Sequence, residues 1–120
     1  MKTVKFRVVH RLSLNNMLDA RGNAGGSMTE LNKILKVVEK LQLTEEEVKH
    51  VNLRLEDGAL KWSTKGEDGS DLDPAKEIEL ADEQVDLLKT MLKEKDEKKE
   101  FKMAEAGPVN EIVKELELEL

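Results

Sequence analysis

The stretch SMTELNKILKVVEKL, residues 27–41, carries the local pattern that decides the fold. It starts with the S-x-x-E spacing of a capping box, in which Ser27 and Glu30 bond to backbone N–H groups at a helix start. Apolar residues then recur at helical spacing, at Leu31, Ile34, Leu35, Val38 and Leu41. The sequence predicts a helix over residues 28–41 with this face buried. We expect Leu35→Ala and Val38→Ala to cost roughly 2–4 and 1–3 kcal/mol of folding free energy, respectively.

The residues before this helix predict a strand and a shorter helix. Polar and apolar residues alternate through residues 2–9, which is the period of a strand with one buried face. Apolar residues at i, i+3 and i+4 then favour a helix over residues 13–20. The run RGNAGGS, residues 21–27, ends that helix, because glycines adopt backbone conformations that break it.

The residues after the helix predict a hairpin, a strand and two more helices. A second capping box, TEEE at residues 44–47, starts one or two helical turns that end near Lys49. Alternating runs at 51–56 and 59–63, joined by Asp57-Gly58, are typical of a β-hairpin. The polar loop at 65–75 is followed by an expected strand at 76–80 and by expected helices at 82–99 and 109–117.

This order of elements predicts an α+β fold. We expect a small, mostly antiparallel sheet of three to four strands, with the helices packed on one face. A chain of 120 residues is the size of one domain. We assign residues 1–105 to that domain and residues 106–120 to a C-terminal helix or tail that is loosely attached. The final ELELEL is interpreted as a frayed tail or an edge strand.

Composition excludes several classes of protein. Aromatic residues make up 2% of the chain, too few for the stacking platforms that hold single-stranded nucleic acid. There is no cysteine, which excludes disulfides, thiol nucleophiles and cysteine zinc sites. No apolar run approaches the roughly 18 residues of a transmembrane helix, and the N-terminus lacks the pattern of a signal peptide. We expect a soluble cytoplasmic protein.

The net charge of −6 conceals two opposite segments. Residues 1–40 carry eight basic and three acidic side chains, whereas residues 65–86 carry two basic and nine acidic ones. Such a distribution can steer a charged partner, and the effect is screened by salt. The alternative is that the two segments neutralise each other within the fold.

Sites for chemistry are weakly indicated. The turn at residues 21–27 lacks the spacing of a Walker loop and is interpreted as a link whose serine caps the next helix. The acidic loop at 65–75 lacks the glycine and glutamate positions of an EF-hand, which favours a solvated loop over a cation site. His10 and His50 are expected at strand ends, without metal-ligand spacing. We predict no catalytic, cofactor-binding or metal site.

The candidate partner-binding residues are Arg11, Arg21, Asn23 and Trp62. The two arginines belong to the basic first third of the chain, and Arg21 and Asn23 belong to the glycine-rich turn. Trp62 is the one tryptophan of the chain. It either packs on the hairpin or anchors a partner, because tryptophan is enriched in interface hot spots.

Several motifs resemble a family of small uncharacterised phage and prophage proteins. They are LSLNNMLDARGN (12–23), VVEKLQLTEEEV (37–48), GALKW (58–62) and EIELADEQVDLLKTMLKEKDEKK (77–99). The resemblance covers most of residues 2–100 and departs at Ala20-Arg21, where the family has a Pro-Lys type turn, at the acidic loop and after Phe101. It implies an origin in a mobile element and brings no catalytic residue.

We therefore expect a small non-enzymatic phage-type accessory protein that binds a host or virion protein, for example as an inhibitor or adaptor. One alternative is a component or chaperone of phage particle assembly. A second is a nucleic-acid-directed module that uses the basic first third, although the chain contains no recognised DNA-binding motif. No cofactor and no membrane contact are expected.

Overall fold

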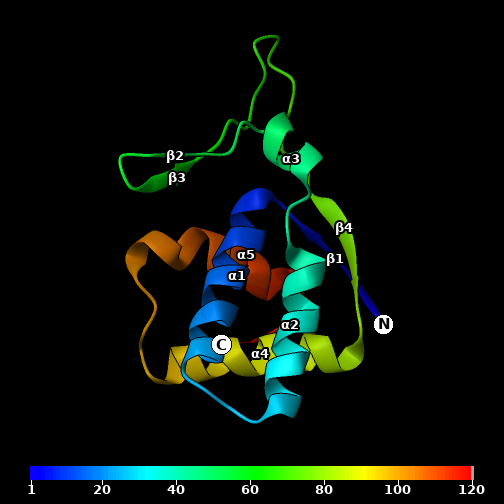
Figure 1. Cartoon of the computed structure of the whole chain (residues 1–120), viewed down its shortest axis with the longest axis vertical. Helices are drawn as coiled ribbons and strands as arrows, with labels where there is room; N and C mark the ends of the chain where they lie inside the picture. Colours follow the sequence, from blue (N-terminus) through cyan, green and yellow to red (C-terminus); the bar gives the residue numbers. More distant parts are fainter. Residues whose placement is uncertain (120) are drawn as a thin grey trace.

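Four helices pack against one face of an antiparallel strand pair to form the body of the molecule (Figure 1). A computed structural model describes residues 1–119. Its helices are α1 (Val8–Asn23), α2 (Met28–Leu41), α3 (Glu45–His50), α4 (Asp82–Glu97) and α5 (Ala106–Glu115), with a 3-10 turn η1 (Met103–Glu105) before α5. Its strands are β1 (Lys2–Phe6), β2 (Arg54–Glu56), β3 (Ala59–Lys61) and β4 (Lys76–Leu80). The predicted α+β class is confirmed.

The four strands form two separate antiparallel pairs instead of the one sheet that we expected. β1 pairs with β4, with Val4 opposite Ile78, and the apolar side chains of this pair enter the core. β2 pairs with β3 through a turn in which Asp57 and Gly58 both have positive φ, at 51° and 78°. The hairpin was predicted correctly from Asp57-Gly58, but its strands are shorter than residues 51–56 and 59–63.

α1 begins five residues before the predicted start and ends three residues after the predicted end. The expected strand at 2–9 stops at Phe6, because the backbone N–H of Val8 starts the helix and donates to the carboxylate of Asp73. That acceptor lies 65 residues away in the chain. The residues around Val8 therefore do not by themselves indicate where this helix starts.

α2 has the predicted bounds, and the Ser27 hydroxyl accepts a hydrogen bond from Glu30 N at 3.2 Å. Its buried side chains are Ile34, Val37 and Leu41, while Val38 is half-buried. The prediction that Leu35 is a core residue is wrong, since 57% of it is exposed. Periodicity fixes the existence of an apolar face, and the neighbours α1 and β4 fix which way that face turns.

This orientation of α2 predicts a large loss of stability for substitution of one leucine and almost none for substitution of another. We expect Leu41→Ala to lower the free energy of unfolding by about 2–5 kcal/mol, because the side chain is fully buried. Leu35→Ala should change it by less than about 0.5 kcal/mol. Urea denaturation of the two variants measures both values. A large loss at Leu35 would show that the helix faces the other way.

The C-terminal segment is part of the fold and is not loosely attached. α5 begins three residues before and ends two residues before the expected helix at 109–117, and Val109, Ile112 and Leu116 are buried in the common core. Leu118 beyond the helix is buried as well, while Leu120 lies outside the described residues. α4 ends at Glu97, two residues before the predicted end. The boundary that we placed at residue 105 does not separate two packing units.

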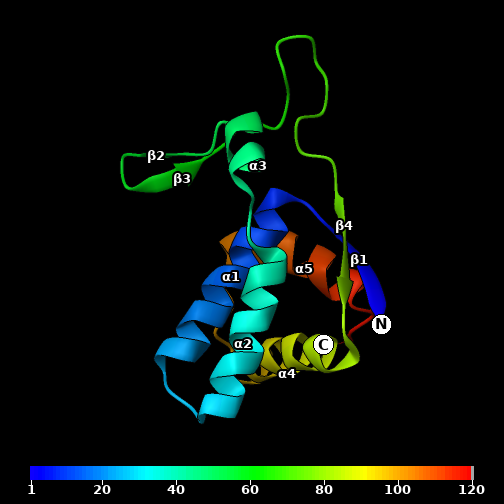
Figure 2. The ribbon, with the colours of Figure 1, turned by 45° about the vertical axis from the view of Figure 1, so that its right-hand side comes forward.

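The remaining elements project from the body as an upper lobe, which we define as residues 45–73 (Figure 2). It contains α3, the β2–β3 hairpin and the acidic loop, which is closed by an isolated bridge between Lys65 and Asp71. No residue of this lobe belongs to the main hydrophobic cluster among the residues described. In the described part of the chain, no helix has the length and apolar content that crossing a membrane requires.

Candidate functional site

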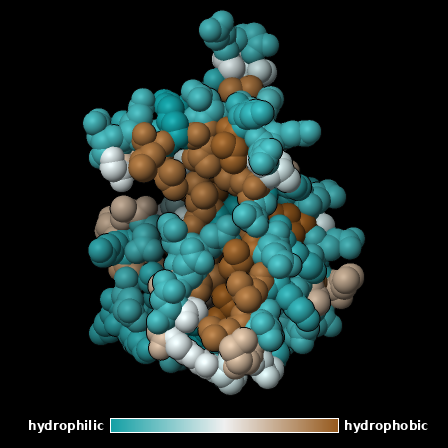
Figure 3. All heavy atoms as spheres, viewed as in Figure 1, coloured by the Kyte–Doolittle hydropathy of each residue, from teal (hydrophilic) through white to brown (hydrophobic). Residues whose placement is uncertain are grey.

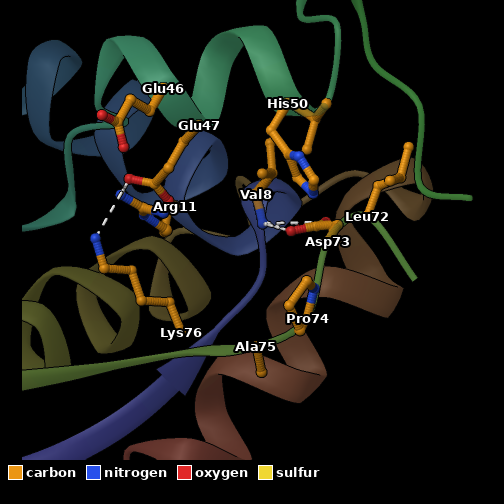
Figure 4. A pocket seen from close by; sticks show the side chains of 11 residues that line it. Val8, Arg11, Glu46, Glu47, His50, Leu72, Asp73, Pro74, Ala75 and Lys76 are labelled. Atoms are coloured by element: carbon orange, nitrogen blue, oxygen red, sulfur yellow. Dashed lines mark hydrogen bonds and ion pairs between the residues drawn. The ribbon is translucent and has the colours of Figure 1, made fainter. Parts of the chain in front are cut away.

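A pocket of about 500 Å³ lies beneath α3, where the upper lobe meets the body (Figure 4). We call it the α3 pocket. Its walls come from the start of α1, from α3 and from the segment that leads into β4. The polar side chains that line it are Arg11, Glu46, Glu47, His50, Asp73 and Lys76, and the apolar ones are Val8, Val51, Leu72, Pro74 and Ala75.

Arg11 forms one wall of the pocket and holds three elements together. Its Nε donates to the carbonyl oxygen of Leu41 at 3.0 Å, and Nη2 donates to that of Gln42 at 2.7 Å. These carbonyls lie at the end of α2. The guanidinium also binds both carboxylate oxygens of Glu47 in α3. Arg11 was predicted to bind a partner, but its side chain is only 2% exposed and its donors are used within the fold.

Glu47 is the acidic partner of this clamp and also caps α3. It forms a reciprocal capping box with Thr44, as the TEEE motif predicted, and Lys76 approaches its Oε1 at 3.3 Å. The hydrogen bond from Arg11 is the main cause that lowers the pKa of Glu47 from 4.5 to about 2. Both cations of the pocket are thus engaged by one carboxylate.

The clamp predicts a specific loss of stability in acid. Because the pKa of Glu47 is lower in the folded state, its contribution is complete above pH 4.5 and is lost as the pH falls toward about 2. Solvent screening at a partly exposed carboxylate reduces the effect, so we expect about 1–2 kcal/mol. Urea denaturation across this pH range should show a steeper loss for the wild type than for Glu47→Gln. Parallel curves for the two proteins would contradict this role of Glu47.

Asp73 forms the opposite wall and is 6% exposed. Its two carboxylate oxygens lie 3.0 and 3.3 Å from the N–H of Val8, at the positive end of the α1 dipole. Arg7 binds the main-chain carbonyl of Asp73 at 2.8 Å and not its carboxylate. Asp73 is therefore a buried carboxylate without an ion-pair partner among the described residues.

The other predicted partner-binding residues lie apart from this pocket. Arg21 pairs with Glu94 at 2.6 Å, which lowers the pKa of the Glu94 carboxyl, and Asn23 is exposed at the end of α1. Both lie in the last turn of a 16-residue helix, about 20 and 23 Å along the axis from its start. Trp62 is half-buried directly after β3. The structure does not bring the four residues together.

The two histidines lie in helices and not at strand ends. His10 is buried in α1, where Nδ1 accepts from the N–H of Arg7 at 3.0 Å and Nε2 contacts the carboxylate of Glu111. His50 ends α3 and lines the pocket. Among residues 1–119, no group of three histidine or carboxylate side chains is placed to hold a metal ion.

A second surface was missed by the sequence reasoning. Leu55 and Leu60 face each other across the hairpin and are 70% and 49% exposed. Figure 3 shows apolar side chains gathered over this part of the upper lobe. We call Leu55 and Leu60 the hairpin surface. The signal in the sequence was a leucine on each side of the Asp57-Gly58 turn, which we took only as evidence of strand alternation.

Comparison with protein-family models, with curated proteins and with solved structures found no match to this chain.

Proposed function

We propose that this chain is a small non-enzymatic accessory protein that binds another protein through the hairpin surface. The observation that carries the proposal is the pair of exposed leucines, Leu55 and Leu60, on an element outside the core. Each strand of the hairpin also has one outer edge whose backbone groups are unpaired in the sheet. A partner can cover the apolar face or add a strand to such an edge.

The two faces of the hairpin differ in polarity, because successive strand residues point to opposite sides. Leu55 and Leu60 share one face, whereas Arg54, Glu56 and Lys61 lie on the other, where Glu56 forms ion pairs with both basic residues at 3.3 and 3.8 Å. The leucine face is therefore the apolar side that a partner would cover. The charged face protects so short an edge from pairing with the wrong chains. Trp62, directly after β3, remains a predicted contact residue for the partner.

The resemblance to phage and prophage proteins supports a host or virion protein as the partner, with the chain acting as an inhibitor or adaptor. The nucleic-acid alternative has less support. Several cations of the basic first third are paired within the fold, as in Lys2–Glu117, Arg11–Glu47 and Arg21–Glu94. Their charge is therefore less available to phosphates than the sequence alone indicated.

The test compares the tagged chain with two variants in capture of proteins from the cells that make it. Leu55→Ser/Leu60→Ser removes the hairpin surface, and Leu35→Ser removes an exposed leucine of α2 as the matched control. We expect the wild type and the control to capture the same host or virion protein and the double variant to lose it at least about tenfold. Equal capture by all three proteins, or capture by none, would overturn the proposal.

The assembly alternative makes a different prediction for the isolated chain. A particle component or its chaperone is expected to form a defined ring or higher oligomer, whereas an adaptor that meets its partner through one hairpin can remain a monomer. Light scattering on the purified protein separates the two. A defined oligomer that the Leu55→Ser/Leu60→Ser variant fails to form would assign the hairpin surface to self-assembly.

A further inference from the structure

We propose that the α3 pocket receives the ammonium group of a lysine side chain from the bound protein. This inference rests on the proposed function, because it names one feature of the partner. The pocket volume of about 500 Å³ lies in the range that ligand sites in proteins have. This volume exceeds that of one lysine side chain.

The charges of the pocket favour a cation. Both of its cations, Arg11 and Lys76, are bound to Glu47. The other two carboxylates, Asp73 and Glu46, form no ion pair within residues 1–119, and Asp73 is buried while Glu46 is exposed at the pocket. No ion pair neutralises the Asp73 carboxylate within the described residues, so an ammonium that enters the pocket meets an opposite charge there.

The shape of the site favours lysine over arginine. Both oxygens of Asp73 already face the N–H of Val8, which disfavours the parallel two-bond contact that a guanidinium makes best. An ammonium is a compact charge with three donors. In Figure 4 the His50 ring points from α3 toward Asp73. An imidazole nitrogen without a proton can accept a hydrogen bond from the ammonium group.

Apolar walls accommodate the rest of the side chain. Val51, Leu72 and Pro74 line the pocket and suit the four-carbon stem of a lysine, which buries its methylenes while its charge is held. The pocket is also joined to the hairpin, because Ser63 N donates to the carbonyl oxygen of Val51 at 2.7 Å. The segment after β3 is therefore bonded to a residue that lines the pocket, and a partner that extends beyond the hairpin surface can reach it.

The first test uses a small probe and needs no partner. Nα-acetyl-lysine methylamide, which keeps its ε-ammonium group free, is titrated to millimolar concentration into the full chain. Backbone amide shifts are followed by NMR. N-acetyl-norleucine methylamide, which has a similar stem without the charge, is the control probe. We expect saturable amide shifts at Val8, at His50 and at the non-proline residues of 72–76 with the lysine probe alone. Equal shifts with both probes, or none with lysine, would overturn the inference.

Two variants test the roles of the carboxylates. Asp73→Asn keeps the shape and an acceptor for Val8, and it should weaken binding of the lysine probe at least about tenfold. Glu46 is an exposed residue of the pocket lining. Glu46→Gln should weaken binding of the lysine probe about two- to threefold and leave the fold intact. Unchanged binding in both variants would contradict the proposal. If Asp73→Asn fails to fold, Glu46→Gln and the choice of probe still decide it.

The hairpin variant separates this inference from the proposed function. Leu55→Ser/Leu60→Ser should lose the partner and keep the response to the lysine probe. If the probe fails to bind while capture still depends on the hairpin, the pocket inference alone is overturned. If the probe binds and capture does not depend on the hairpin, the proposed function alone is overturned.

Discussion

Replacing Arg11 with methionine is expected to lower the free energy of unfolding by roughly 3–5 kcal/mol, the cost of breaking a buried ion pair from one side. Methionine fills much of the same volume but supplies no donor. The carbonyls of Leu41 and Gln42 and the carboxylate of Glu47 then lose their shared partner. The contact that joins α1, the end of α2 and α3 is lost with it.

Thermal and urea denaturation of Arg11→Met measure this loss. The matched control is Arg54→Met, because Arg54 is a partly exposed arginine, with 39% of its side chain accessible, whose ion pair with Glu56 lies on the hairpin. We expect this control to change stability by less than about 0.5 kcal/mol. The double variant Arg11→Met/Glu47→Gln should lose less than the sum of the two single variants. Equal losses for Arg11→Met and Arg54→Met would refute the buried clamp.

Ile112→Ala should cost about 2–5 kcal/mol, because the side chain is fully buried and its removal leaves a cavity among α5 and its neighbours. This result is the opposite of the one expected for a loosely attached C-terminal tail. Urea denaturation gives the value, and a single transition would show that α5 unfolds together with the body.

Asn110→Ala is the control for this prediction, since Asn110 is exposed on the same helix. It should leave stability within about 0.5 kcal/mol of the wild type. If Ile112→Ala is also neutral, α5 does not belong to the core, and the division at residue 105 that the sequence favoured would be right.

The elements that could be predicted are those whose signals are local. α2 has the predicted bounds because a serine cap and a helical apolar pattern lie within 15 residues. β4 and the hairpin turn were found from alternation and from Asp57-Gly58 for the same reason. In each case the residues that form the structure are neighbours in the chain.

The elements that could not be predicted depend on distant residues. The start of α1 is held by Asp73, and the apolar face of α2 turns toward α1 and β4, which leaves Leu35 in solvent. Arg11 looked like a surface charge because its acceptors lie 30 to 36 residues away. A charged residue on a helix gives no indication of such partners, so its burial cannot be read from local sequence.

The candidate site shows the same limit. His50 and the acidic loop were visible as separate features, and the fold brings His50 and Asp73 to one pocket. The exposure of Leu55 and Leu60 follows from the separation of the two strand pairs, which alternation does not encode. A hairpin within one larger sheet would have presented the same sequence pattern.

Hydrogen–deuterium exchange of the chain with and without its captured partner tests the central claim most directly. The account predicts that the partner slows exchange in the hairpin, residues 54–61, and around the α3 pocket at residues 72–76. Exchange on the exposed face of α2, which includes Lys33 and Lys36, should stay unchanged. Protection confined to α2, with the hairpin amides exchanging as in the free protein, would contradict the account.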